Sequence, residues 1–523
     1  MTLVATSIGL FMIYLDATII NVALPAIQED FSANEQGVQW VVAAYSLTMA
    51  MFIMSAATLA DQRGRRRVYL GGLALFAVAS ALCGLAPSLA VLVIGRGLQG
   101  VGAAVVNVAS LALVSAAFPD PKMKAKAIGL WTAIASIGLA LGPVVGGVLT
   151  ETLGWRSIFF INVGVGAVGI VLARAVVAES RDPRPRDLDL AGQLLFIAGI
   201  GALTYALIEG PHSGWASPMI IGLFVGAVVL IVGFVVVELR SNEPMMDVRL
   251  FSDRVYDVAI LTLFVVLFCI YGMTLITTQY LQNVRDYEPA QAGIVLGVYT
   301  LPVMILSPIA GALVVRSGSR RPIIWGLCAL IVGLLILAAG IGGSIAFVVV
   351  GLLFIGAGGG LVLTPTTNAA MEAVPPDRGG MASGILSAQR ALGSTAGFAI
   401  MGSILAGVIA STLPDKFAPY VPEPDLTTEV DAVVDSANPR AVVSVIGRAQ
   451  PLPQPVRDRA ELLAAADDAF VQGIRLALLI GAGLAVAILV AAFVILPRRA
   501  ARERKDMSIS QSIVRQEDAG HIP

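Results

Sequence analysis

The sequence predicts an all-α integral membrane protein whose chain crosses the bilayer fourteen times. Of its 523 residues, 57% are hydrophobic and only 13% are charged, and the mean hydropathy is +0.85. A soluble domain carries about 25% charged residues, so most of the surface of this protein must face lipid. The formal net charge of −1 excludes a bulk electrostatic attraction to nucleic acid.

The apolar runs of the chain set the number of spans. A helix needs about 20 mostly apolar residues to cross a bilayer, and fourteen runs meet this requirement. The first six runs lie at residues 3–25, 38–60, 68–86, 89–118, 127–150 and 157–178. A pair follows at 190–208 and 219–237. The last six lie at 258–280, 291–315, 322–340, 346–371, 381–409 and 471–496.

The basic residues predict the orientation of these spans. Placing the N-terminus in the cytoplasm puts Arg63, Arg65, Arg66 and Arg67 in a cytoplasmic loop, together with most of the 34 lysines and arginines in such loops or in the tail. Because basic residues gather on the cytoplasmic side, we expect both termini to be cytoplasmic. No basic segment or small-residue cleavage site marks the first span as a signal peptide, so we expect a multi-pass protein of the cell membrane.

Two loops reveal an internal repeat. Residues 57–67 read ATLADQRGRRR and residues 311–321 read GALVVRSGSRR, with Val315 where Asp61 stands. Many secondary transporters are built from such repeats, with the substrate site between the halves. The repeat therefore pairs the first six spans with the last six. The predicted regions are a six-helix bundle at 1–180, an inserted two-helix linker at 181–256, a second six-helix bundle at 257–497 and a cytoplasmic tail at 498–523.

The second bundle contains a long outer loop at residues 411–470. Its richness in proline, aspartate and alanine predicts a mostly irregular segment, and residues 461–470 are expected to lengthen the last helix outward. A solvated connector is favoured over a binding role.

The composition also argues against several kinds of active site. Cys83, Cys269 and Cys328 are too scattered for a metal cluster or a disulfide framework, and His212 and His521 are the only histidines. A membrane-embedded enzyme would need clustered histidine and acidic residues or a nucleophile triad within the spans, and none is present. The chain has no Gly-x-x-x-x-Gly-Lys motif for nucleotide phosphates. We therefore expect no metal and no cofactor, and transport driven by a gradient.

Four motifs stand in order on the early spans. They read LDATIINVALP at 15–25, LADQRGRRR at 59–67, RGLQGVGAA at 96–104 and GLALGPVVGG at 138–147. With these motifs the chain resembles the 14-span drug:proton antiporter group of the major facilitator superfamily, most closely the tetracycline/spectinomycin-type exporters of actinobacteria. The resemblance covers nearly the whole chain. One departure is Ala57, which stands where the loop motif usually opens with glycine.

The resemblance implies a major facilitator fold of two six-helix bundles plus two inserted helices. It implies proton-coupled export of amphipathic small molecules by alternating access, in which protons and membrane lipids are the other partners and the chain is a monomer. Export of an endogenous lipid or metabolite on the same scaffold is the alternative, and no sequence feature separates the two.

Asp16 is the most informative single residue. A carboxylate inside a membrane span is costly and by default marks a functional site. Asp16 lies nine residues before Pro25, and Arg96 lies nine residues after Pro87. At about 1.5 Å per residue both lie roughly 13 Å below the outer surface, so they could pair if their spans are adjacent, as the family fold implies. A proton-coupling pair is preferred, and a permanent ion pair that locks two helices is the alternative.

The loop around Asp61, Gly64 and Arg65 is predicted to form a tight cytoplasmic turn. Gly64 permits the bend, and Asp61 is able to accept hydrogen bonds from backbone amides at the N-terminus of a neighbouring helix. The resemblance implies that this loop latches the outward-facing state, with Asp120 as a candidate partner. The simpler interpretation is a basic anchor on the cytoplasmic side.

The fourth motif predicts a tight and bent helix seam. Four glycines follow the small-residue spacing that lets helices approach closely, and Pro143 removes a backbone hydrogen bond. The glycines are Gly138, Gly142, Gly146 and Gly147. The resemblance implies that this motif is typical of exporters.

Arg390 is a charged residue about ten residues inside its span, with no acidic partner evident in the second half. It is a candidate for contact with an anionic or carbonyl-rich substrate, and pairing with Asp16 or with helix carbonyls is the alternative. The remaining candidates for the substrate cavity are polar residues that could equally form hydrogen bonds between helices. They are Asn21, Asn107, Tyr271, Gln279 and Asn368.

Overall fold

The computed structural model describes residues 1–118, 120–181, 189–241, 244, 251–372, 374, 379–417 and 457–496. Within these residues the chain is helical and has no strand. The first group of helices comprises α1 (Thr2–Phe31), α2 (Glu35–Arg63), α3 (Arg65–Gly84), α4 (Leu89–Ala117), α5 (Pro121–Leu153) and α6 (Ser157–Val176). A pair follows, α7 (Leu190–Ser213) and α8 (Pro218–Arg240). The last group comprises α9 (Arg254–Gln279), η2 (Tyr280–Val284), α10 (Pro289–Gly297), α11 (Thr300–Ser317), α12 (Arg320–Gly340), α13 (Ile345–Glu372), α14 (Gly379–Phe417) and α17 (Arg457–Ile495).

These helices confirm the predicted all-α membrane fold. Thirteen helices of the described chain are long and apolar enough to cross a bilayer, and the apolar part of α5, 137–153, is a shorter further segment. Each of the fourteen predicted runs lies within one of these helices to within two residues, except 291–315, which covers α10 and α11. The expected lengthening of the last helix over 461–470 is present, because α17 begins at Arg457. Residues 418–456 of the predicted outer loop and the predicted tail at 498–523 lie outside the described residues.

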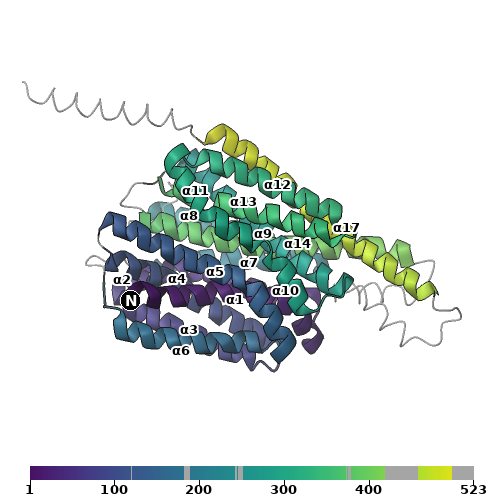
Figure 1. Cartoon of the computed structure of the whole chain (residues 1–523), viewed down its shortest axis with the longest axis horizontal. Coiled ribbons are helices and arrows are strands. Elements are labelled where there is room, and N and C mark those ends of the chain that lie inside the picture. The colour runs from purple at the N-terminus through teal and green to yellow at the C-terminus, as the bar shows by residue number, and fades with distance from the viewer. Residues whose placement is uncertain are drawn as a thin grey trace, which may run out of the picture.

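The first and last groups of helices form two bundles that lie side by side (Figure 1), and the helices within each bundle pack in the same pattern. In the first group α1 contacts α5 and α6, α4 contacts α2 and α3, and α3 contacts α6. In the last group α9 contacts α14 and α17, α13 contacts α11 and α12, and α12 contacts α17. Each contact in one group therefore has its counterpart in the other, as the sequence repeat leads one to expect.

The repeated loops also share their backbone and one hydrogen bond. Gly64 and Gly318 both have positive φ, +106° and +77°, which favours glycine. Two residues further on, the Arg66 Nη2 donates to the Arg174 carbonyl at the end of α6, and the Arg320 Nη2 donates to the Phe493 carbonyl at the end of α17. We call the end of the molecule with these two turns the basic end and the opposite end the far end.

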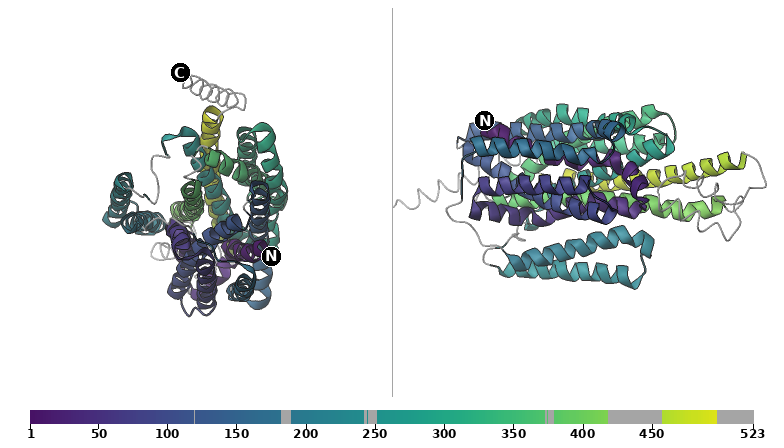
Figure 2. Two further views of the ribbon diagram at one scale, coloured as in Figure 1. Left: turned by 90° about the vertical axis from the view of Figure 1, so that its left-hand side faces the viewer. Right: turned by 90° about the horizontal axis from the view of Figure 1, so that it is seen from below.

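The inserted pair α7 and α8 forms a hairpin at the edge of the molecule (Figure 2). Helix α7 is attached on both sides. The Gln193 Nε2 donates to the Met51 carbonyl of α2 at 2.6 Å, and the Ser403 hydroxyl of α14 donates to the Leu207 carbonyl at 3.1 Å. The hairpin therefore bridges the two bundles beside the seam where α2 meets α14.

The two bundles also meet towards the far end through α5 and α10. A Cβ atom added at Gly147 would lie 2.6 Å from the Pro289 carbonyl oxygen, so the two backbones are in direct contact. Nearby, the Gln282 Nε2 of the π-helical turn η2 donates to the Val22 carbonyl at 3.0 Å. The sequence predicted one span at 291–315, whereas the structure divides it into α10 and α11. Both parts contact α5 of the first bundle, and α10 makes most of that contact.

Candidate functional site

The carboxylate of Asp16 is the centre of a buried polar cluster. Its side chain is fully enclosed, and its Oδ2 accepts from the Arg96 Nη1 at 2.6 Å. Its Oδ1 accepts from the Asn162 Nδ2 at 2.6 Å and from the Gln99 Nε2 at 3.2 Å. Three donors from α4 and α6 thus surround one carboxylate on α1. Donors of this kind stabilise the charged form of a buried acid.

Arg96 is held by a second set of contacts from α2. Its Nε donates to the Val41 carbonyl at 3.0 Å, and its guanidinium lies 4.4 Å from the centre of the Tyr45 ring. Its Nη1 also donates to the Gln99 Oε1 at 2.9 Å. The Nη2 is buried and has no hydrogen-bond partner among the described residues. The arginine therefore joins α2 and α4 to the acid on α1.

The ion pair alone would be a poor source of stability. Two buried charges lose their hydration, and their mutual attraction offsets that loss only when further hydrogen bonds satisfy the remaining atoms. Gln99 meets part of this condition, because its amide donates both to the carboxylate and to the Ser80 hydroxyl at 2.7 Å, whereas the Arg96 Nη2 has no partner among the described residues. With the Val41 carbonyl included, the cluster spans α1, α2, α3, α4 and α6. Losing one partner would leave an uncompensated charge in the core of the first bundle.

The sequence analysis did not identify Asn162, and it included Gln99 only as one position of the motif at 96–104. The signal was present, because Asn162 is the single amide side chain within the apolar helix α6. The criterion that picked out Asn21 and Asn107 applies equally to it. The sequence could not show that the Asn162 Nδ2 lies 2.6 Å from the Asp16 Oδ1, because the two residues are 146 positions apart in the chain.

The loop between α2 and α3 is closed by an acid that the sequence analysis did not name. The Glu179 carboxylate accepts from the backbone amides of Arg66 at 3.0 Å and Arg67 at 3.3 Å, at the start of α3. A Cβ atom on Gly64 would lie 2.8 Å from the Glu179 Oε1. Glycine is therefore required here both by its positive φ and by the close approach of this carboxylate.

The two acids expected at this loop have these partners among the described residues. Asp61 forms an ion pair with Arg65 at 2.8 Å, one helical turn away, and its predicted contact with the N-terminus of a neighbouring helix stays a prediction. Asp120 caps α5, with its Oδ1 accepting from the Met123 amide at 2.9 Å. At the N-terminus of α3 the acceptor is Glu179, which follows α6, and α6 packs on α3.

The glycine motif of α5 has two contact faces. Added Cβ atoms would lie 2.6 Å from the Phe11 carbonyl at Gly138 and 2.5 Å from the Ile19 carbonyl at Gly146, so this face packs on α1. An added Cβ at Gly142 would clash with Thr18, whose hydroxyl donates to the Leu139 carbonyl at 3.1 Å. Gly147 instead faces α10, where the Pro143 carbonyl approaches Gly293. The motif therefore joins α5 both to its own bundle and to the other one.

The cavity candidates lie in different surroundings. Asn21 is fully buried, and both of its amide atoms lack a partner among the described residues. The Tyr271 ring meets Phe398 edge-on at 5.6 Å. The Arg390 Nη2 donates to the Thr367 hydroxyl at 2.7 Å, and its buried Nε has no partner in the described chain. Arg390 therefore does not pair with Asp16.

The other three candidates are also buried or engaged. Gln279 and Asn107 are 2% and 7% exposed. The Asn368 amide donates to Ser319 at 3.3 Å and to Glu372 at 2.9 Å. These partners stand at the end of α13 and beside the Gly318 turn, which places Asn368 at the basic end and not at mid-membrane depth.

Comparison with known proteins gives a consistent picture. A family model described as Major Facilitator Superfamily matches residues 6–398. The chain is 51% identical over 509 residues to multidrug resistance protein Stp of Mycobacterium tuberculosis, covering 97% of this chain and 94% of that protein. It is 41% identical over 497 residues to the drug efflux pump JefA of the same organism, covering 95% and 97%. It is 31% identical over 513 residues to the tetracenomycin C resistance and export protein of Streptomyces glaucescens, covering 95% and 91%.

Solved structures share the fold. An inward-facing bacterial homolog of the human lysosomal transporter Spinster superposes with a TM-score of 0.63 at 15% identity, covering 95% of this chain and 97% of that one. The human organic anion transporter MFSD10 superposes with a TM-score of 0.58 at 14% identity, covering 94% and 98%. At these identities the likeness concerns the arrangement of helices alone.

Proposed function

Because this chain belongs to the Major Facilitator Superfamily and is a multi-pass membrane transporter rather than an enzyme, we propose that it exports amphipathic small molecules in exchange for protons. Relatives that match along nearly the whole chain are named as a multidrug resistance protein, a drug efflux pump and an antibiotic resistance and export protein. That likeness supports drugs, such as those of the tetracycline or spectinomycin type, as substrates.

The cluster around Asp16 is the observation that carries proton coupling in this proposal. The carboxylate is fully buried and accepts hydrogen bonds from donors on α4 and α6. Protonation cancels the charge of the carboxylate and weakens the bonds to Arg96, Gln99 and Asn162 together. The packing of α1 on α4 and α6 then loses the electrostatic attraction between the Asp16 carboxylate and these donors. One proton can thereby change the packing of the first bundle, which is what coupling to a conformational change requires.

Substrate is proposed to bind between the bundles. Arg390 is the second-half residue best suited to this role, because its buried Nε has no partner within the described chain and Thr367 holds only its Nη2. A carbonyl or anionic group on the substrate would satisfy that donor. Tyr271 and Phe398 supply aromatic surface on neighbouring helices. An amphipathic molecule with an oxygen-rich edge fits this set.

The proposed cycle places the basic end in the cytoplasm. The chain then lies in the cell membrane as a monomer with both termini inside, and the proton gradient supplies the energy without a cofactor. The contact of α5 with α10 closes the outer side in this conformation. Export requires that contact to separate while the bundles close at the basic end.

The direct test is transport by purified protein in proteoliposomes with an imposed pH gradient and a panel of drugs, phospholipids and metabolites. Drug accumulation that requires the gradient, together with proton movement in the opposite direction, is the expected result. Gradient-driven movement of a lipid or metabolite but of no drug would favour the endogenous-exporter alternative. Equal transport with and without the gradient would refute proton coupling.

A further inference from the structure

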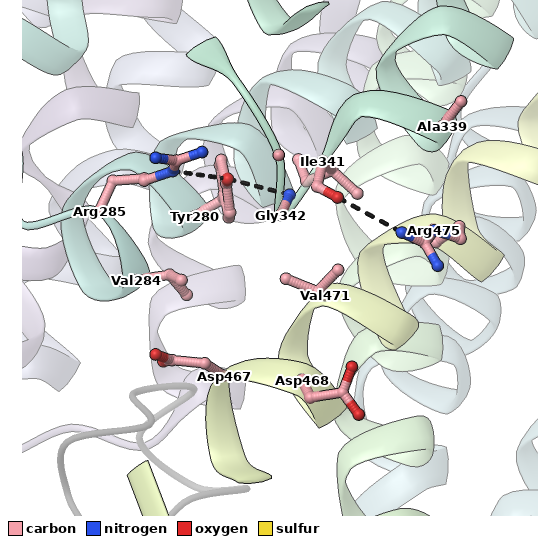
Figure 3. A pocket seen from close by; sticks show the side chains of 11 residues that line it. Tyr280, Val284, Arg285, Ala339, Ile341, Gly342, Asp467, Asp468, Val471 and Arg475 are labelled. Atoms are coloured by element: carbon pink, nitrogen blue, oxygen red, sulfur yellow. Dashed lines mark hydrogen bonds between the residues drawn. The ribbon is translucent and has the colours of Figure 1, made fainter. Parts of the chain in front are cut away.

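A pocket lies at the far end, entirely within the second bundle. It has a volume of about 610 Å³ and is walled by the end of α9 with η2, by the turn between α12 and α13, and by α17 (Figure 3). None of the residues assigned above to proton coupling or to substrate lines it. Pockets of this volume are typical of sites for small ligands.

One wall of the pocket carries a guanidinium with unused hydrogen-bonding capacity. The Arg285 Nε donates to the Tyr280 hydroxyl at 2.8 Å, and the same hydroxyl accepts from the Gly342 amide at 3.0 Å. The Arg285 Nη2 is buried and has no acceptor among the described residues. A buried donor without an acceptor is costly. An anionic oxygen from a ligand would offset that cost with a charge-assisted hydrogen bond.

The other arginine of the pocket is already occupied. The Arg475 Nε donates to the Ala338 carbonyl at 3.0 Å, and its Nη2 donates to the Ile341 carbonyl at 3.4 Å. These carbonyls belong to the C-terminal end of α12, where a cation is favourable. Arg475 thus shapes the pocket by fixing the turn after α12, and Arg285 is the group left to bind an anion.

The wall contributed by α17 carries acids. Asp468 is engaged by Lys416 and by the Gln472 amide. Asp467 also lines the pocket, and Figure 3 shows Asp467 and Arg285 on opposite sides of the space. The lining therefore combines two cationic side chains, Arg285 and Arg475, with the carboxylates of α17. A ligand that carries both charges matches such a lining better than a ligand of a single sign.

The backbone around Arg285 is irregular. Tyr280 begins the π-helical turn η2, and π-helical turns are frequent at functional sites. Directly after Arg285, Asp286 has φ +58°, which is uncommon for a residue other than glycine. These features turn the chain between α9 and α10 so that Arg285 stands at the pocket, while Gln282 in the same turn contacts Val22 of the first bundle.

We propose that this pocket binds a small zwitterion, with its phosphate or carboxylate group on Arg285 and its ammonium group near Asp467. The zwitterion is either a free solute or the headgroup of a phospholipid such as phosphatidylethanolamine, because both carry these two charged groups. The site is separate from the drug pathway, so it stands whether or not the proposed function does.

O-phosphoethanolamine is the probe, and binding to the purified full-length protein is measured by calorimetry in detergent. Saturable binding of the probe is expected, and inorganic phosphate and ethanolamine should each bind at least tenfold more weakly than the probe. Arg285→Gln should weaken binding of the probe at least tenfold, and Asp467→Asn should weaken it without weakening phosphate. Arg156→Gln is the matched control, because Arg156 is a far-end arginine paired with Asp30 at 2.8 Å outside the pocket; this variant should bind like the unaltered chain.

Hydrogen–deuterium exchange locates the site independently of affinity. The probe should slow exchange in residues 280–285 and 467–475 of the unaltered protein and not in Arg285→Gln, with melting temperatures confirming that each variant is folded. In nanodiscs, loss of probe binding with phosphatidylethanolamine but not with phosphatidylcholine would assign the site to the lipid headgroup. Equal binding in both would assign it to a free solute.

Three results would overturn the proposal. They are the absence of saturable binding at millimolar probe in both detergent and phosphatidylcholine nanodiscs, unchanged affinity in Arg285→Gln, and phosphate binding as tightly as the probe.

Discussion

Asp16 is held by donors that belong to three other residues and two other helices. The distances of 2.6 Å to Arg96 and to Asn162 are those of strong, charge-assisted hydrogen bonds. Such a carboxylate can serve as a proton carrier only if its bonds open during the cycle. A coupling site and a permanent lock therefore differ in what happens when the acid cannot titrate.

Asp16→Asn keeps the size and polarity of the side chain but cannot release a proton. We expect this variant to lose uphill export and substrate-induced proton release while retaining some downhill exchange. The measurement is drug flux in proteoliposomes with and without a pH gradient. A folded, inserted Asp16→Asn protein that still drives uphill export would show that the proton carrier lies elsewhere.

Asn162→Leu removes one donor from the carboxylate and leaves the acid in place. Because the cluster then loses a hydrogen bond to a charged group, which contributes about 1.5–3 kcal/mol, we expect pH-gradient-driven export to fall by about tenfold or more. The measurement is drug flux in proteoliposomes under one imposed pH gradient. Asn162→Gln, which keeps an amide donor, should restore part of the flux. Unchanged flux in Asn162→Leu would contradict the role of this residue.

At the scale of the element, the turn between α2 and α3 depends on one glycine. Gly64→Val would impose a side chain where φ is +106° and where the Glu179 carboxylate already lies. We expect turnover to fall more than equilibrium drug binding, because the loop biases conformational states and does not touch substrate. Gly71→Val is the control, since an added Cβ there meets nothing within 4 Å. Binding lost at unchanged turnover would refute the latch role.

The contact between α5 and α10 is a second element with a clear test. Gly147→Val would push against the backbone of Pro289 and Ala290, at 2.6 and 2.7 Å from the new Cβ. The far end should therefore open in a larger fraction of molecules. Spin labels at Glu151 and Glu288 would report this as a longer distance population in dipolar spectroscopy. Gly164→Val is the control, because an added Cβ there meets nothing within 4 Å, and it should leave the distance distribution unchanged. An unchanged distribution in Gly147→Val would contradict the role of the α5–α10 contact in closing the far end.

At the scale of the whole molecule, the two bundles are alike in packing and unlike in charge. The helix contacts and the Arg66 and Arg320 bonds repeat, whereas Val315 replaces Asp61 and α9 has no counterpart of Asp16 at mid-membrane depth. The proposed coupling site thus belongs to the first bundle, and the proposed substrate contact at Arg390 belongs to the second. A molecule built in this way can respond to a proton in one half and to a substrate between the halves.

The orientation of the whole chain is predicted by its basic loops. Reporter fusions after Arg67, Lys126 and Arg321 should be cytoplasmic, and fusions within 411–470 should be external. Paired reporters, one active only inside the cell and one only outside, provide the measurement. A cytoplasmic signal from 411–470 would contradict the fourteen-span topology.

The helices, their order and the matching depths of Asp16 and Arg96 all follow from the residue pattern alone. Apolar length is a local property, since each span must satisfy its own backbone hydrogen bonds in lipid, and it can be recognised one segment at a time. Depth follows from counting residues along one helix. The all-α membrane fold and the family motifs are therefore predictable from the amino-acid sequence.

The partners of the polar residues, in contrast, depend on tertiary packing. Asn162 reaches Asp16, Glu179 occupies the turn at Gly64, and Gly147 faces α10 because of how the helices rotate and pack about one another. Asn368, predicted for the cavity, stands at the basic end for the same reason. A helix turns each residue towards particular neighbours, and the identity of those neighbours depends on contacts between segments far apart in the chain.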